Sequence, residues 1–308
     1  IKEIADLSKK LFDVLISLAE THKSSLMPGY THFQIAMPSS FGLWFSAYAE
    51  SLSEDLELLA TSLSVVQKNP LGSGAGFGSA FPLDRDFTTA SLHLEKMNIN
   101  SVYAQMTRGK SEKITAMAMS TIASTLGKLA YDICMFSNQN YGFISFPSEL
   151  TTGSSIMPHK KNPDVFELIR AKSARIQSLP NELALLTNNL PSGYHRDFQL
   201  TKEIIFPGIQ DLKDCLTIFE LMLKNIQIKE NILNDEKYDY LFSVEKINEL
   251  VIDGMSFREA YRKVGNSIED GTYHYRNDDL KHTHKGSIGN LCLEEITQNF
   301  EEIFVKFK

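Results

Sequence analysis

The sequence predicts an all-α protein, a bundle of long helices followed by a small helical domain. Two observations carry this prediction. Apolar residues recur at helical spacing over stretches much longer than a strand, whereas strand-like patterns are confined to short pieces such as 143–146. With 43% hydrophobic and 22% charged residues, the chain of 308 residues can also bury a large core.

The first half of the chain predicts three helical stretches. Residues 1–18 already follow helical spacing, and the first residue is not methionine. We therefore expect the chain to begin mid-helix, as a fragment that lacks an N-terminal domain. Residues 38–67 carry one broad apolar stripe, which predicts a helix of about eight turns at ~3.6 residues per turn. A second long helix is expected at 111–138.

Two further long helices are expected in the second half. One begins at Asn162, with Asn162 as N-cap and Pro163 as the first helical residue, and Pro180 kinks or ends it. The other covers 198–223 and is interrupted near residues 207–208. Helices of this length usually pack side by side in a bundle, often across subunits.

Near Ile228 the composition shifts to shorter helices joined by polar turns. Ser256, followed three residues later by Glu259, is typical of a capping box. We therefore expect residues 1–227 to form the central helical-bundle domain and residues 228–308 a small C-terminal helical domain.

Composition limits the partners and the location. A formal net charge of −7 argues against a nucleic-acid surface, which needs clustered Lys and Arg. No apolar run approaches the ~20 residues of a membrane span. The three cysteines, Cys134, Cys215 and Cys292, are far apart and suit reduced thiols in the cytoplasm. His282 and His284 lack the clustered cysteines or carboxylates of a metal site, so no metal is expected.

The segment 153–164 (GSSIMPHKKNPD) combines a flexible Gly-Ser-Ser stretch with two lysines and a helix start. Lysine ammonium groups and free backbone N–H groups both favour a bound anion, so a carboxylate could sit here. A polar interhelical loop with a good cap is the plain alternative.

The same string resembles the GSSxMPxKxNP loop of the fumarase/aspartase superfamily, homotetrameric lyases that eliminate fumarate from succinyl-type substrates. Three other segments resemble the argininosuccinate lyases within it: 29–34 (GYTHFQ), 69–75 (NPLGSGA) and 192–203 (SGYHRDFQLTKE). The chain departs from that family at His195 and Arg196, which replace an Asn and a Lys. Arg108 falls on the arginine of the family's SERD motif, but Gly109 follows it in place of the aspartate, which leaves the partner of Arg108 open.

The resemblance implies cleavage of argininosuccinate, the small-molecule substrate, to arginine and fumarate in a homotetramer, with no metal and no organic cofactor. Ser154 matches the proposed base, and His32, supported by Glu167, would act at the leaving nitrogen. The implied substrate-binding residues are Thr31, Lys160, Asn162, Tyr194, Gln199 and Lys202. For Glu167 a favourable helix-dipole contact is the alternative role, and for Tyr194 and Gln199 ordinary packing.

Two other functions stay open at the level of sequence. A sibling lyase (adenylosuccinate lyase, fumarase or aspartase) shares the loop, although it should lack the combined segments at 29–34 and 192–203. A non-catalytic structural homologue of the crystallin kind would keep the fold and the tetramer without turnover. The family's SRND segment, which binds the substrate carboxylate, does not occur in this chain.

Overall fold

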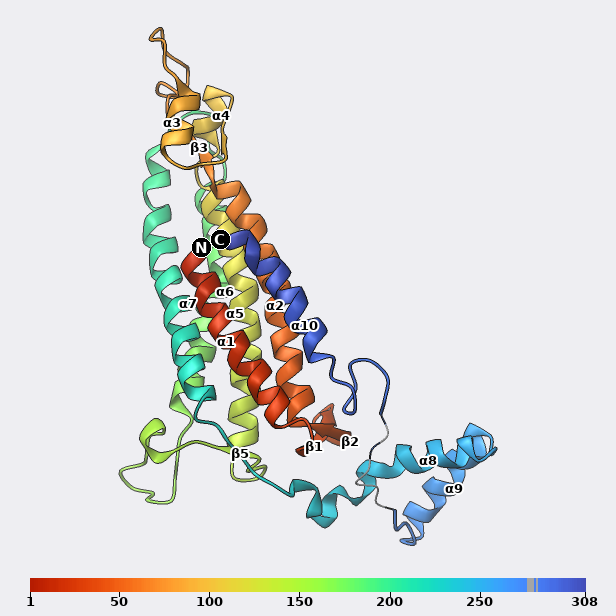
Figure 1. Ribbon diagram of the computed structural model, residues 1–308. Helices are drawn as coiled ribbons and strands as arrows, with labels where there is room; N and C mark the ends of the chain where they lie inside the picture. Colours follow the sequence, from red (N-terminus) through yellow and green to blue (C-terminus); the bar gives the residue numbers. More distant parts are fainter. Residues whose placement is uncertain (276–279, 281) are drawn as a thin grey trace.

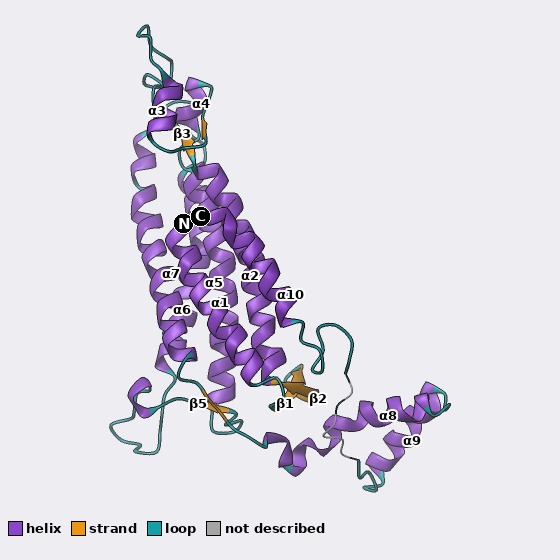
Figure 2. Cartoon of the chain, in the orientation of Figure 1, coloured by secondary structure: helices purple, strands orange, loops and turns teal. Residues whose placement is uncertain are grey.

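The computed structural model describes residues 1–275, 280 and 282–308, and long helices dominate it (Figures 1 and 2). The all-α prediction is confirmed. The helices are α1 (Lys2–Thr21), α2 (Phe41–Val66), α3 (Arg85–Ser91), α4 (Ser101–Met106), α5 (Lys110–Ser137), α6 (Asp164–Leu186), α7 (Thr201–Leu223), α8 (Ser243–Ile252), α9 (Phe257–Glu269) and α10 (Leu293–Phe304). Short 3-10 helices lie at Ser148–Leu150, Arg196–Gln199, Ile232–Asn234, Glu236–Phe242 and Val305–Phe307.

Six of these helices, α1, α2, α5, α6, α7 and α10, run side by side as the bundle (Figure 1). Each contributes an apolar face to one continuous core, because helical spacing places every third or fourth residue on the same side. Phe12, Phe45, Ile122, Phe166 and Phe219 are fully buried there. A polar contact joins two of the helices inside this frame: Asp132 on α5 accepts hydrogen bonds from Trp44 (3.1 Å) and Tyr48 (2.6 Å) on α2.

Proline does not end either of the helices that contain it. Pro180 lies within α6 and Pro207 within α7, although an interior proline costs about 3 kcal/mol or more. The buried side chains on both sides of each proline hold the helix together, so tertiary packing outweighs the missing hydrogen bond. Gly208 explains the close approach there: a Cβ on it would lie 2.3 Å from a methyl group of Leu179 on α6.

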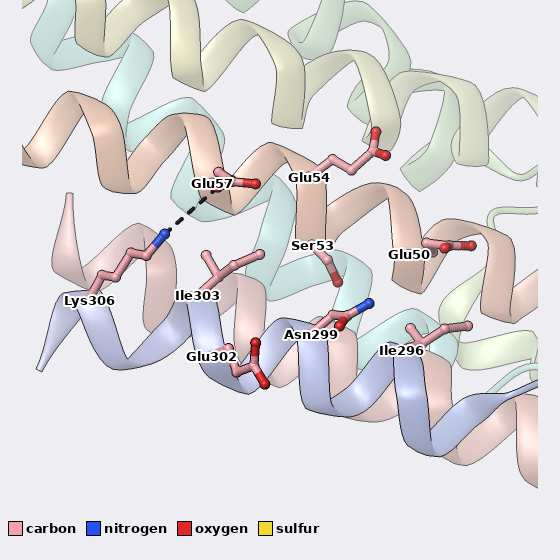
Figure 3. A pocket seen from close by; sticks show the side chains of 9 residues that line it. All are labelled: Glu50, Ser53, Glu54, Glu57, Ile296, Asn299, Glu302, Ile303 and Lys306. Carbon is pink, nitrogen blue, oxygen red and sulfur yellow. Dashed lines mark ion pairs between the residues drawn. The ribbon is translucent and has the colours of Figure 1, made fainter.

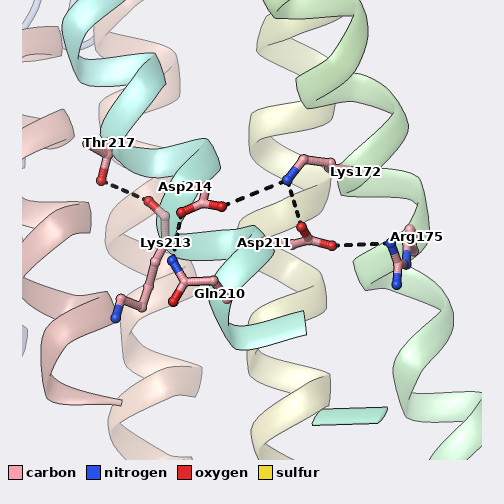
Figure 4. Close-up of polar contacts among 7 residues, drawn as sticks. All are labelled: Lys172, Arg175, Gln210, Asp211, Lys213, Asp214 and Thr217. Atoms are coloured by element: carbon pink, nitrogen blue, oxygen red, sulfur yellow. Dashed lines mark hydrogen bonds and ion pairs between the residues drawn. The ribbon is translucent and has the colours of Figure 1, made fainter. Parts of the chain in front are cut away.

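Charged side chains also join α6 to α7 (Figure 4). The Lys172 ammonium lies 2.7 Å from the Asp211 carboxylate and 3.9 Å from that of Asp214. Arg175, one turn further along α6, lies 3.6 Å from Asp211. Asp211 is mostly buried, whereas both cations reach solvent, so these ion pairs add little to the free energy of unfolding. Their main effect is to fix the position of α6 along α7.

The predicted start of the third long helix was wrong. The N-cap is Pro163 and the helix begins at Asp164, with no side-chain cap. Asn162 cannot cap because it is held outside the helix: its backbone forms a β-bridge with Thr152, and its N–H donates to the Thr152 carbonyl at 2.8 Å.

A β-hairpin precedes α2, and the sequence analysis did not predict it. Strand β1 (Leu26–Thr31) pairs antiparallel with β2 (Gln34–Ser40), with a register shift around Gly29. Pro28 and Gly29 within β1 and Pro38 within β2 hid the strand pattern. Two more pairs are very short: β3 (Lys68–Asn69) with β4 (Lys96–Met97), and β5 (Ile144–Ser145) with β6 (Gln227–Ile228).

The last third of the chain leaves the bundle and returns to it. Helices α8 and α9 form a separate hairpin beyond one end, with their own small core around Ile247 and Val264 (Figure 1). The predicted capping box of Ser256 and Glu259 is confirmed at the start of α9. Helix α10 then packs on α1 and α2, so residues 293–304 share the main core. The domain boundary at 228 stays a prediction.

We predict that α10 is needed for the stability of the bundle. The fully buried ring of Phe300 stacks on Phe12 of α1 at 3.8 Å between centroids. Replacing Phe300 with Ala should lower the free energy of unfolding by about 3–5 kcal/mol. Phe257→Ala, at a side chain that is 62% exposed, is the matched control and should change it by less than about 0.5 kcal/mol. Urea denaturation followed by circular dichroism measures both, and equal effects would contradict the packing of α10.

Candidate active site

The loop that carries the Gly-Ser-Ser motif is closed at its base. Asn162 donates its backbone N–H to Thr152 at 2.8 Å, and the Thr152 hydroxyl donates to the Asp164 carboxylate. These contacts hold the two ends of the loop together across the residues between them. Sequence reasoning missed Thr152, which directly precedes the motif, and assigned no role to Asp164, the last residue of the motif.

Within this loop the two serines differ. The Ser154 hydroxyl oxygen accepts hydrogen bonds from the backbone N–H groups of Ile156 (3.2 Å) and Met157 (3.0 Å), and the residue is half-buried. Ser155 is exposed. Backbone donors aimed at an oxygen stabilise negative charge on it, so Ser154 is the serine whose deprotonated form the loop favours.

The two lysines of the loop also differ. Lys161 donates to the Ser148 hydroxyl at 3.0 Å. Lys160 is exposed, and no carboxylate of the described residues pairs with it, so its positive charge is available to an anion. His159 is exposed beside it. The Asn162 side chain points back toward the Gly153 carbonyl, with 3.5 Å between nitrogen and oxygen.

Thr31 and His32 lie at the tip of the β1–β2 hairpin. Thr31 pairs with Gln34, so His32 and Phe33 form the two-residue turn, and both have positive φ (53° and 59°). Such turns favour glycine or asparagine, and a bulky residue in this conformation costs about 1–2 kcal/mol. His32 is exposed at this turn, so its imidazole can reach a ligand. Strain of this kind gathers at functional sites, which supports the choice of His32 as a candidate.

Glu167 lies in the first turn of α6, exposed, on the same end of the bundle as the loop. No hydrogen bond or ion pair joins it to His32 within the described part of the chain. Glu167 lies near Cys134 of α5 instead. Burial raises the pKa of the Cys134 thiol, the positive charge of Arg170 lowers it, and the negative charge of Glu167 raises it further. The pairing of Glu167 with histidine therefore stays a prediction that one chain by itself does not satisfy.

Tyr194, Gln199 and Lys202 lie around the turn between α6 and α7. Gln199 donates its side-chain N–H to the Tyr194 hydroxyl oxygen at 3.1 Å. Lys202 is exposed in the first turn of α7. Arg108, whose partner the sequence left open, stacks on the Tyr194 ring with its guanidinium carbon 5.2 Å from the centroid. The structure thus brings Tyr194 and Gln199 into contact and adds Arg108 to them.

These two groups of residues lie at opposite ends of the bundle. The Ser154 loop enters the N-terminal end of α6, and Tyr194 follows its C-terminal end. The 23 residues of α6 correspond to ~35 Å of helix. One chain therefore cannot place Ser154 and Tyr194 on the same small molecule.

The Gly-rich segment 72–78 packs against α3 and α4: a Cβ on Gly72 would lie 2.9 Å from the Arg85 side chain, and one on Gly76 would lie 2.8 Å from that of Gln105. Gly74 has a φ of +53°, and a Cβ there would lie 2.2 Å from the Gly78 carbonyl oxygen, so the turn requires glycine. Arg85 supports it by donating to the carbonyls of Leu71, Asn98 and Ile99.

A separate groove lies between α2 and α10, with a volume of about 480 Å³ (Figure 3). Glutamates line it, and none of the predicted site residues does. Across the described residues, no three His, Cys, Asp or Glu side chains gather as a metal site, and His282 contacts the Glu245 carboxylate at 2.9 Å. No described helix is both long enough and apolar enough to cross a bilayer.

Comparison with solved structures shows the same fold in two lyases. An EDDS lyase, solved in complex with formate, superposes with a TM-score of 0.81 over 99% of this chain and 68% of its own, at 19% identity. The class II fumarase of Schistosoma mansoni superposes with a TM-score of 0.74 over 87% of this chain and 60% of its own, at 18% identity. At these identities the likeness concerns the fold alone.

Sequence comparison defines the family. A family model described as lyase matches residues 1–178. The argininosuccinate lyase of Bacteroides fragilis (strain YCH46) is 56% identical over 96% of this chain and 66% of its own length. That of Bacteroides thetaiotaomicron is 54% identical over 98% and 68%. The chain thus spans about two thirds of the length of these curated relatives, and it belongs to the argininosuccinate lyase family of the fumarase/aspartase superfamily.

Proposed function

We propose that the protein cleaves argininosuccinate to arginine and fumarate by β-elimination. The observation that carries this proposal is the Ser154 hydroxyl, which receives two backbone N–H groups inside a lysine-bearing loop. Relatives that share more than half of their aligned residues with this chain are named for this reaction. The sequence relatives favour this reaction over those of the sibling lyases, which share the loop, and over a structural homologue without turnover.

The elimination begins with removal of a proton from the carbon next to one succinyl carboxylate. Ser154, as the alkoxide, accepts that proton, and its backbone donors compensate the weak acidity of a serine hydroxyl. The electron pair left on carbon spreads onto the carboxylate. Lys160 and the Asn162 amide stabilise that charge as it develops, which is usually the largest electrostatic contribution.

The carbon–nitrogen bond breaks next. The electron pair on carbon forms the double bond of fumarate, and the bonding pair leaves with the guanidino nitrogen of arginine. That nitrogen needs a proton, and we assign the proton transfer to His32, because imidazole titrates near neutral pH without assistance. Thr31 lies next to it at the hairpin tip, and Glu167 holds the imidazole in the assembled site. No step requires a metal or an organic cofactor.

The amino-acid end of the substrate is assigned to Tyr194, Gln199 and Lys202. Because these residues lie ~35 Å from Ser154 along α6, a complete site must combine ends of different chains. Exposed apolar side chains on α5 and α6 support an obligate helix-to-helix interface: Met117, Tyr131, Leu168 and Leu185. We therefore propose a homotetramer with sites shared between subunits.

A cytoplasmic location and the absence of nucleic-acid partners are proposed as well. Cys134, Cys215 and Cys292 are free thiols, and burial raises the pKa of Cys215 to about 11, so it stays protonated and unreactive. This suits a reducing compartment. The net charge of −7 is unfavourable for phosphate binding.

We predict that the full-length protein is a tetramer by native mass spectrometry. We also predict that two impaired variants complement each other. Ser154→Ala and Tyr194→Leu chains, mixed by co-expression, should regain part of the activity, because some sites then receive both native residues. Co-expression of Ser154→Ala with Ser154→Gly is the control and should regain none. A monomeric mass at micromolar concentration would contradict the shared site.

We predict that Ser154→Ala lowers kcat for fumarate release from argininosuccinate by ~10²–10⁴ and changes KM much less. Ser155→Ala is the matched control and should be mild. Lys160→Met should damage kcat and KM together, because its charge meets the carboxylate in ground and transition states alike. Fumarate absorbance in steady-state assays measures all three. Equal losses for the two serines would exclude Ser154 as the base.

We predict that His159→Gln keeps most activity, although His159 lies next to Lys160. The imidazole is exposed and has no part in the proton transfers assigned above. The same fumarate assay, run beside His32→Gln, separates the two histidines. A thousandfold loss of activity in His159→Gln, with only a mild loss in His32→Gln, would show that His159 and not His32 is the general acid.

A further inference from the structure

Arg108 lies in the turn between α4 and α5 and is half-buried against two aromatic rings. Its guanidinium carbon is 5.2 Å from the centroid of Tyr194 and 5.9 Å from that of Phe198. A cation over an aromatic face is attracted by the negative charge of the π-system. The contact therefore joins the start of α5 to the loop between α6 and α7.

The backbone beside Arg108 aims this side chain. Gly109 is left-handed, with a φ of +81°, and a Cβ there would lie 2.4 Å from the Thr187 methyl group and 3.7 Å from the Phe198 ring. Only glycine allows the turn to approach the end of α6 this closely. The N–H of Gly109 is also fixed, because it donates to the Glu112 carboxylate at 2.9 Å.

The stacking leaves the charge of Arg108 free to act on a ligand. No carboxylate among the described residues forms an ion pair with it, and the ring beneath it belongs to a residue that is 45% exposed. Gln199 donates to the Tyr194 hydroxyl oxygen at 3.1 Å, so the phenolic O–H keeps its capacity to donate to a ligand. The Tyr194 hydroxyl thus lies on the ring that the Arg108 guanidinium covers, and no carboxylate of the described residues neutralises that guanidinium.

We propose that Arg108 is a positioning and specificity-determining residue for the amino-acid end of the substrate, acting through Tyr194. The guanidinium holds the phenol ring so that its O–H meets a carboxylate, and its positive charge favours an anionic acceptor there. The inference rests on the proposed function and deepens it, since it concerns the half of the substrate that leaves as arginine.

Product inhibition of the full-length enzyme separates the two ends of the substrate. Arg108→Met should weaken inhibition by arginine about 3- to 30-fold, the range of a cation–π contact, and leave inhibition by fumarate within about twofold. KM should rise with little change in kcat. Arg108→Lys keeps a positive charge over the ring, so its inhibition by arginine should be intermediate between that of the wild type and that of Arg108→Met. Arg258→Met, at an exposed arginine on α9, is the control for charge loss and should change neither constant.

A double-mutant cycle tests whether Arg108 acts through Tyr194. In a Tyr194→Leu background, Arg108→Met should weaken arginine inhibition by less than about twofold, because the contact with the Tyr194 ring is already lost and the remaining contact with Phe198 does not position the phenol. Additive effects would overturn the proposal, as would equal weakening of arginine and fumarate. If Arg108→Met does not fold, Arg108→Lys decides by the same selectivity for arginine. Calorimetry with arginine alone tests Arg108 even if the protein releases no fumarate from argininosuccinate, and unchanged arginine affinity in Arg108→Met would then overturn the inference.

Discussion

The close packing of α5 against α6 is the constraint on which the other features of the structure depend. Ala116, Ala123 and Ala130 recur at seven-residue spacing on α5 and are fully buried. Gly127 meets Ser173 of α6, where an added Cβ would be only 3.3 Å from the serine Cβ. Small side chains let the two backbones approach along their whole length, and van der Waals attraction falls steeply with separation. The pair therefore forms the centre on which α2 and α7 pack, and α1 and α10 complete the bundle by packing on α2, α7 and each other.

The α5–α6 pair determines where the candidate site residues can lie. Every candidate residue lies at an end of it, in the segments that enter or leave a long helix, and none lies in the packed middle. The Ser154 loop closes its base through Thr152 and Asp164, and the hairpin presents His32 in a strained turn. At the other end Gly109 draws Arg108 onto Tyr194. A rigid scaffold fixes the loops, and assembly between chains would then bring the two ends together.

The division between scaffold and loops also agrees with the comparisons. The EDDS lyase shares this fold at 19% identity, so many different side chains can fill the same bundle. Helical cores tolerate such exchange as long as volume and apolar pattern are kept. The positions at which this chain departs from the family motifs that it resembles lie in the end loops: Gly109, which follows Arg108 where the motif has an aspartate, and His195 and Arg196.

The sequence by itself determined the helices and the family. Helical periodicity predicted the bounds of α2, α5, α6 and α7 to within a few residues. A long helix that buries one face has apolar residues at every third or fourth position, and this pattern is visible in the sequence. Motif strings identified the Ser154 loop and the Tyr194 segment. Only the tertiary structure decided what depends on contacts between distant residues. The Thr152 bridge moved the cap from Asn162 to Pro163, cross-strand pairing made a hairpin of a segment rich in Pro and Gly, and packing on Phe12 returned α10 to the bundle. The distance between Ser154 and Tyr194 likewise follows from the length of α6, and the motif around either residue does not predict it.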